Sequence, residues 1–322
     1  MAITGPTSYV GTTQQFITHW DSVNEGLPAN GKLALPDGMT VTTFTAKRTL
    51  LLAKRDDVEN ADIDLSVARA DLEIKKEWLH EKINLFNEAI VGKLPNSAYA
   101  RTLPLVPGIG DGQENFTKPM KGARRIWEKI NNSTPPLLPA GLTLKDGTNQ
   151  SMFASAIMEL SALYDAVTDV EKDVSIEIAR RDDVETVLYA AMKQYRLSAP
   201  AVLQEGSALI DTLPRLTPEG GRTPSPVELF GAYDAVNHAA DLNWPASSDT
   251  DLEEYEVRVT FGPTWSDSNN HIAGTVAAGA ARILKTTKGL QAPGAVATYK
   301  VYVKLKSGGE AGSNIVAIAR PV

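Results

Sequence analysis

Two stretches of the chain carry apolar residues at every seventh position, which is the spacing of a helical seam. Each stretch is about fifty residues long and nearly free of glycine and proline, so the pattern predicts two long, coiled-coil-like helices. In the first stretch the seam residues are Leu51, Val58, Leu65, Leu72, Leu79 and Phe86. In the second they are Phe153, Leu160, Val167, Val174, Leu188 and Tyr195.

The alternative is that each stretch folds back into a helical hairpin at its charged centre, residues 54–57 or 180–183. The heptad phase continues through both centres, and neither contains a turn residue, which favours continuous helices. Arg181 nevertheless interrupts the second seam.

The two stretches belong to an internal duplication. A Trp-x-x-hydrophobic-Asn motif precedes each stretch, at residues 20–24 and 127–131. A proline- and glycine-containing loop follows each motif, and the sequence of residues 35–40 resembles that of residues 138–143. Related segments, 96–104 and 206–214, end the two stretches. Four landmarks in the same order predict two tandem repeats, each a short helix, a loop and a long helix, which bury their seams against each other in one elongated bundle.

The amino-acid composition of the chain changes after residue 213. A segment rich in proline and glycine follows, as in an interdomain linker. Beyond it, apolar and polar residues alternate in short runs such as 255–261 and 299–305, which indicates strands of a two-sheet sandwich. We therefore expect a multidomain α + β protein with helical repeats at 1–110 and 111–213, a linker at 214–226 and a β-sandwich at 227–322.

The C-terminal segment resembles the fibronectin type III domain. A strand ending in Trp244, an Asp-Leu-x-x-Tyr-x-Val motif at 251–257 and a Pro-Gly pair before Tyr299 carry the resemblance. It implies that Trp244 packs in the core and that Tyr299 forms a corner tying a loop to the sheet. The polar insertion at 262–271 departs from the family pattern. Residues 1–220 show no resemblance to a known family.

Composition and charge narrow the function classes. The chain has 322 residues, of which 43 % are hydrophobic and 22 % charged, as in a folded soluble protein. Its net charge of −7 and the absence of a basic block argue against nucleic acid as a partner. The lack of a long apolar run argues against membrane insertion. We expect synthesis in the cytoplasm, while signal-less export or incorporation in a particle leaves the final compartment unknown.

Little in the sequence points to catalysis. The four histidines, His19, His80, His238 and His271, lack zinc-ligand spacing, and the chain has no cysteine and no nucleophile-elbow motif. We expect no cofactor, no metal and no enzymatic activity.

Instead, we expect a structural protein that self-associates or docks into a larger assembly through its helices and displays the sandwich. The alternatives are a monomeric adhesion module for protein or glycan, and an accessory subunit of a hydrolase. The candidate interface residues are Trp265 and His271, both expected in the polar insertion with His271 solvated, and Glu310, in a glycine-rich loop.

Overall fold

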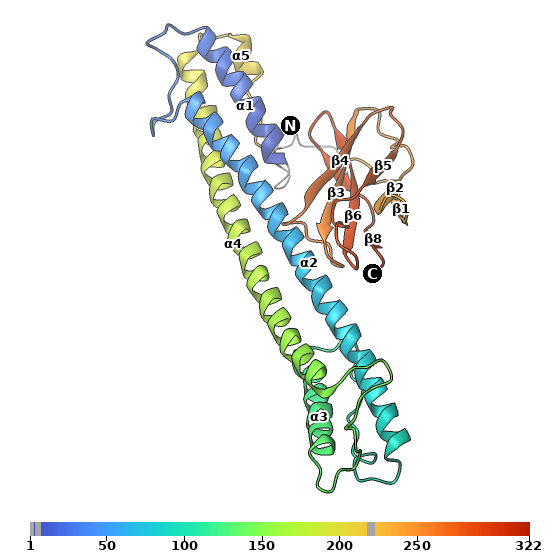
Figure 1. Cartoon of the computed structure of the whole chain (residues 1–322). Coiled ribbons are helices and arrows are strands. Elements are labelled where there is room, and N and C mark those ends of the chain that lie inside the picture. Colours follow the sequence, from blue (N-terminus) through green and yellow to red (C-terminus); the bar gives the residue numbers. More distant parts are fainter. Residues whose placement is uncertain (1–2, 4–7, 218–222) are drawn as a thin grey trace. The chain divides into compact units, whose positions relative to one another are not determined.

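The computed structural model describes residues 3, 8–217 and 223–322 (Figure 1). Residues 218–222 of the expected linker lie outside the described residues. The long helices α2 (Val41–Lys93) and α4 (Gln150–Val202) each run unbroken for 53 residues. The prediction of continuous helices is confirmed, and the hairpin alternative is wrong. The remaining helices are α1 (Ser8–Glu25), α3 (Gln113–Asn131) and the short α5 (Ala208–Asp211).

The chain forms two compact units. Unit 1 comprises residues 1–66 and 172–322, and unit 2 comprises residues 67–171. Both long helices contribute residues to both units, so the units do not coincide with the two sequence repeats. The sequence boundaries at residues 110 and 213 mark the duplication and stay predictions.

In unit 1, α1 packs on the start of α2 and the end of α4. Trp20 of α1 is fully buried, with its ring centroid 4.7 Å from that of Tyr195 in α4 and 5.9 Å from that of Phe44 in α2. Leu51 and Leu188, two of the predicted seam residues, belong to the same cluster. Burial of these large side chains is the main stabilising contribution of this core.

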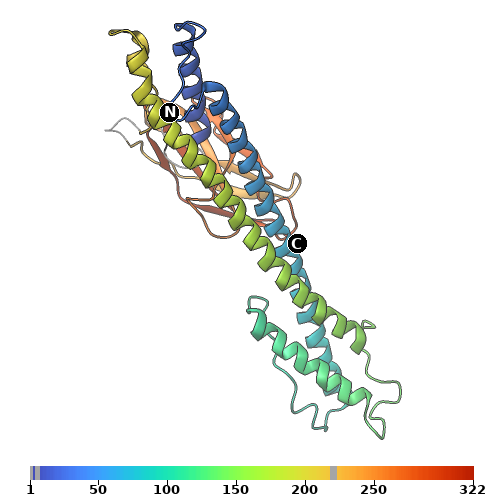
Figure 2. The ribbon, with the colours of Figure 1, turned by 90° about the vertical axis from the view of Figure 1, so that its left-hand side faces the viewer.

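In unit 2, α3 takes the corresponding place beside the end of α2 and the start of α4 (Figures 1 and 2). Trp127 of α3 is fully buried, with its ring centroid 5.1 Å from that of Phe86 and 5.7 Å from that of Phe153. Each aromatic core thus combines the short helix and helix start of one repeat with the helix end of the other. Neither repeat completes its own core.

The Trp and Asn of the repeated motif hold the loop that follows. The indole nitrogens of Trp20 and Trp127 donate hydrogen bonds to the carbonyls of Leu33 and Leu142, at 3.2 and 2.9 Å. The N–H groups of the same two leucines donate to the side-chain oxygens of Asn24 and Asn131, at 2.9 and 2.8 Å. Pairing these backbone groups avoids the cost of burying them unbonded, which explains the motif.

The structure corrects the loop match made from the sequence. The turn at residues 35–38 has its counterpart at 144–147, not at 138–141. In both turns an aspartate is followed by glycine with positive φ, 85° at Gly38 and 87° at Gly147. In both, Asp37 or Asp146 accepts a 3.0 Å bond from the N–H two residues later. Residues 138–139 share the Leu-Pro pair of residues 35–36, but the turn requires only the Asp-Gly pair, which residues 146–147 supply.

The C-terminal domain is a sandwich of two antiparallel sheets, the architecture that its resemblance to the fibronectin type III domain implied. One sheet has the order β1-β2-β5, and the other has the order β4-β3-β6-β7, with β8 also pairing with β6. The strands are β1 (Phe230–Asp234), β2 (Ala239–Asn243), β3 (Leu252–Phe261), β4 (His271–Ala277), β5 (Ile283–Thr286), β6 (Val296–Leu305), β7 (Glu310–Gly312) and β8 (Val316–Ala319).

Two implications of the resemblance hold in this domain. Trp244 is buried in the core, with its ring centroid 5.7 Å from that of Tyr255. The buried Tyr299 on β6 donates its hydroxyl to the carbonyl of Lys288 at 2.6 Å, which ties the loop before β6 to the sheet. This is the arrangement of a tyrosine corner.

Candidate binding surfaces

The sheet that contains β3 and β6 has one apolar and one charged face. Tyr255, Val257 and Val259 of β3 point into the sandwich core, and the alternate residues Glu256 and Arg258 point the other way. Glu256 and Arg258 are nevertheless buried. Charged side chains are rarely buried without a partner, so Glu256 and Arg258 are expected to form ion pairs on this face.

Arg258 is the centre of a buried charge network. Its Nε lies 2.5 Å from Glu256, and its two terminal nitrogens donate to the two carboxylate oxygens of Glu310 at 3.1 and 2.7 Å. The guanidinium also lies 3.8 Å from the ring centre of Tyr302. Lys304 donates to the second oxygen of Glu256 at 3.1 Å. The bidentate geometry fixes the position of Glu310 on β7.

The network keeps its members charged. Burial alone would raise the pKa of Glu256, but Arg258 and Lys304 outweigh burial and hold that pKa below its usual value. Burial alone would lower the pKa of Arg258, but the carboxylates of Glu310 and Glu256 raise it.

Helices α2 and α4 add charged groups to unit 1 near this face. Burial lowers the pKa of Arg55 on α2, which lies within electrostatic reach of Glu185, Glu256 and Arg258. Arg181 on α4 is buried and donates to the carbonyl of Ser268, in the β3–β4 loop, at 3.3 Å. This contact explains why an arginine interrupts the seam.

Glu185 on α4 stands out among these groups. Its side chain is buried beside Arg181, with a nitrogen–oxygen distance of 3.8 Å. Desolvation raises the pKa of Glu185 to about 7, even though Arg181 and Arg55 act to lower it. A carboxyl with this pKa gains and loses its proton near neutral pH.

His271 differs from its expected setting. It is the first residue of β4 rather than part of the polar loop, and it is buried rather than solvated. Its Nε2 lies 2.8 Å from a carboxylate oxygen of Asp62 on α2, which also accepts from the side chain of Asn269 at 3.0 Å. Nothing in the sequence marked Asp62, because a buried acid in a charged helix has the same local pattern as a solvated one.

Trp265 and Glu310 lie near the same side chain. The ring of Trp265 is half-buried, with its centroid 6.5 Å from that of Tyr302 and the ammonium of Lys300 at 5.0 Å. Its indole nitrogen donates to Asp267 at 2.7 Å. Tyr302 also contacts the Arg258 partner of Glu310, so the structure brings Trp265 and Glu310 to one sheet face. His271 instead bonds to α2.

Each unit also contains an open groove along its short helix. In both, the groove lies between the short helix and the segment that follows the end of a long helix, marked by Pro104 in unit 2 and Pro214 in unit 1. The α3 groove has a volume of about 770 Å³ and the α1 groove about 650 Å³. The α3 groove is lined chiefly by Pro104, Leu105, Lys118, Pro119, Lys121 and Arg125, and Glu114 adds one carboxylate. The α1 groove is lined chiefly by Gly11, Gln14, Thr18, His19, Leu209 and Pro214.

The two grooves differ in charge. Aligning Trp20 with Trp127 places the cations of the α3 groove opposite neutral residues of the α1 groove. Lys118 corresponds to Gly11, Lys121 to Gln14 and Arg125 to Thr18. The duplication therefore yields one basic and one neutral version of the same surface.

No protein-family model and no curated protein matches the chain. A Fn3-like protein from Clostridium thermocellum is 20 % identical over 31 % of this chain and 97 % of that one, with a TM-score of 0.25. Pectate lyase PelI from Erwinia chrysanthemi is 18 % identical over 29 % of this chain, with a TM-score of 0.25. The spore cortex lytic enzyme SleM from Clostridium perfringens is 21 % identical over 35 % of this chain, with a TM-score of 0.23. The matches cover 28 % of the lyase and 30 % of SleM.

Over residues 3, 8–217 and 223–322, no helix combines the length and apolar character needed to cross a membrane. Within the same ranges, no cluster of three or more histidine, aspartate and glutamate side chains is placed to hold a metal ion.

Proposed function

We propose that this chain is a non-enzymatic structural subunit that associates with copies of itself through its helical part and displays the C-terminal sandwich. The observation that carries the proposal is the duplicated groove. Because the two repeats build the same open surface twice, one chain offers docking surfaces on both α1 and α3. A subunit with two such surfaces is able to contact more than one neighbour, as extended or ring-shaped assemblies require.

Apolar side chains on the long helices support the same function. Met158 and Val187 on α4 are 64 and 40 % exposed, and Ile74 on α2 is 44 % exposed. All three lie outside the predicted seam positions. Contact with another molecule would remove this apolar surface from water, at about 25 cal/mol per Å².

The test is to determine the mass and shape of the full-length protein over a wide concentration range. Mass photometry and sedimentation velocity should show species larger than one chain, and negative-stain electron microscopy should show repeating or closed particles. A single monomeric species at every concentration, up to about 100 μM, would refute the proposal, because a subunit that functions by self-association needs a measurable affinity for itself.

Trp265 favours a second candidate function, the recognition of a protein or glycan by the sandwich. A half-buried indole beside Lys300 and Tyr302 offers an aromatic surface with polar groups at its rim, which is typical of interface anchors. A glycan array probed with the full-length protein tests the glycan version of this function. Binding lost on Trp265→Ala and kept on Phe230→Ala, which alters an exposed aromatic residue of the other sheet, would support it. Absence of binding to every glycan would exclude the glycans tested.

A further inference from the structure

We infer that the α3 groove is the contact site for a second copy of this chain, which presents an acidic face of its own α2. This inference rests on the proposed self-association and names the surfaces that meet. Both surfaces are formed by residues of unit 2.

The α3 groove combines a basic rim with apolar walls. Lys118, Lys121 and Arg125 follow one another at spacings of three and four residues, so they line one side of α3. All three side chains are exposed, and within the part of the chain that the structure describes, none forms an ion pair. Pro104 and Leu105 supply apolar surface, and Leu105 is 86 % exposed.

This basic rim is an exception in an acidic protein. The chain carries 39 acidic and 32 basic residues, a net charge of −7. The corresponding α1 groove has no lysine or arginine in its lining. A basic surface on an acidic chain attracts other copies of that chain, provided that the copies present unpaired carboxylates beside apolar side chains.

Such a face exists on α2 within residues 71–77. Asp71, Ile74 and Glu77 are three residues apart in turn, so they share one side of the helix, and all three are exposed. The nearby cations are already engaged, since Arg69 pairs with Glu171 at 2.8 Å and Lys75 pairs with Glu159 at 2.6 Å.

The two surfaces are complementary in composition and spacing. Each offers charged side chains along a helix at three- or four-residue intervals, with apolar surface beside them, and in the α3 groove the three cations outnumber the one carboxylate, that of Glu114. Docking would place Asp71 and Glu77 of one copy against the basic rim of the other and cover Ile74 and Leu105. Because the two surfaces differ, the contact is heterologous, and its repetition generates a ring or an open filament.

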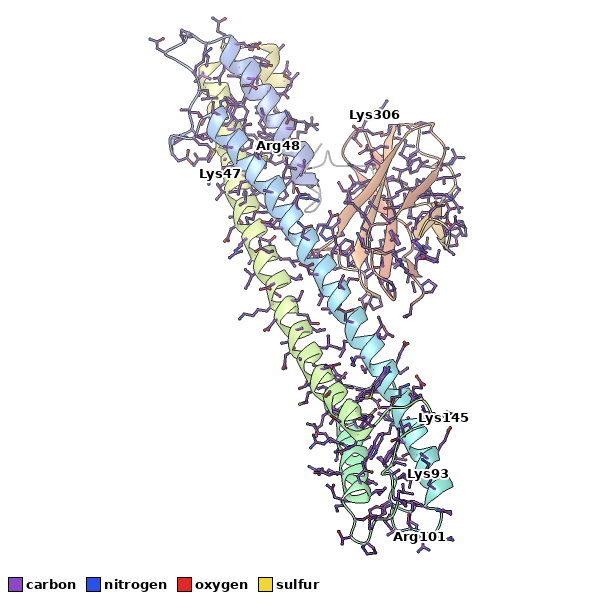
Figure 3. The ribbon with its side chains drawn as sticks, viewed as in Figure 1. Lys47, Arg48, Lys93, Arg101, Lys145 and Lys306 are labelled. Carbon is purple, nitrogen blue, oxygen red and sulfur yellow. The ribbon has the colours of Figure 1, made fainter. Side chains whose placement is uncertain are left out.

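Charge reversal in the full-length protein tests this contact. Lys118→Glu/Lys121→Glu/Arg125→Glu should weaken self-association more than about tenfold at 0.1 M salt, since like charges would then face each other. The matched control is Lys47→Glu/Lys172→Glu/Lys306→Glu, which makes the same change of net charge at exposed lysines outside both grooves; Figure 3 labels Lys47 and Lys306. Association of the control should equal that of the wild type. Circular dichroism checks that both variants fold.

Restoring charge complementarity identifies the occupant. Asp71→Lys/Glu77→Lys alone should also lose association, and mixing it with the groove variant should form a mixed complex. Mass photometry distinguishes the results. A groove variant that associates like the wild type overturns the groove contact but leaves self-association standing.

If the groove variant loses self-association and mixing it with Asp71→Lys/Glu77→Lys forms no complex, α2 is not the occupant of the groove. The same conclusion follows if association recovers only when an unrelated acidic protein is added. Equal loss in the charge-matched control shows a general charge effect and also overturns the contact. A wild type that stays monomeric overturns this inference together with the proposed function.

Discussion

Replacing Glu185 by glutamine should stabilise unit 1 above neutral pH. Glu185 is 8 % exposed and faces Arg55, Arg181 and Asp182. Desolvation raises the pKa of its carboxyl from 4.5 to about 7 in the folded protein, so the folded state holds this proton more tightly than the unfolded state. Glutamine has the shape of the protonated form and no charge to desolvate.

The pKa difference sets the size and the sign of the effect. Between pH 4.5 and about 7 the folded state binds more protons at Glu185 than the unfolded state, so this group lowers the free energy of unfolding as the pH rises. Each unit of pKa difference corresponds to about 1.36 kcal/mol, so the rise from 4.5 to about 7 gives a loss of about 3 kcal/mol above pH 7. Glu185→Gln should therefore raise the free energy of unfolding by about 3 kcal/mol at pH 8 and leave it nearly unchanged at pH 4.5.

Urea unfolding followed by circular dichroism, at several pH values between 4.5 and 8.5, measures this difference. Asp183→Asn serves as the control, because it removes an exposed carboxylate two residues away on the same helix. Equal stability of wild type and Glu185→Gln at pH 8 would show that the buried carboxylate carries no penalty. A constant difference at all pH values would show that Glu185 does not titrate in this range.

Three further substitutions test the packing. Asn131→Ala leaves the buried N–H of Leu142 without its acceptor, so it should lower the free energy of unfolding by about 1–2 kcal/mol in urea unfolding. Tyr299→Phe removes the corner hydrogen bond and should cost about 1 kcal/mol, while hydrogen exchange should speed up in the loop before β6 and stay unchanged in the helices. Gly231→Ala places a methyl carbon 2.7 Å from the side chain of Leu242, and it should lower the melting temperature through a loss of about 1–3 kcal/mol, as measured by calorimetry.

The sequence predicted the helices correctly, but it did not predict every correspondence between the two repeats. The seventh-residue spacing from Leu51 to Phe86 requires a long helix with one apolar side, and α2 has this form. The Trp and Asn of the motif marked the duplication. The match between residues 35–38 and 144–147 was missed because residues 138–141, Leu-Pro-Ala-Gly, resemble Leu-Pro-Asp-Gly more closely in sequence than residues 144–147 do.

The candidate site depended more strongly on distant residues. Trp265 and Glu310 were noticed as an aromatic residue and an acid in loop-like surroundings, but their link through Tyr302 and Arg258 comes from strand pairing. The burial of His271 results from Asp62, which lies 209 residues away in the sequence. Local composition gives the side chains that a loop offers, and contacts between distant segments decide which of them are buried.

By itself, the sequence determined the long helices, the tandem repeat and the two-sheet sandwich, because each depends on local spacing and on short motifs. The tertiary structure alone decided that each aromatic core takes its helix end from the other repeat, and that Glu185 is buried with a pKa near 7. An apolar seam shows that one side of a helix must be buried, but the seam of any other helix could bury it. Which seam covers it, and which charges lose their water, follows from the packing of the whole chain.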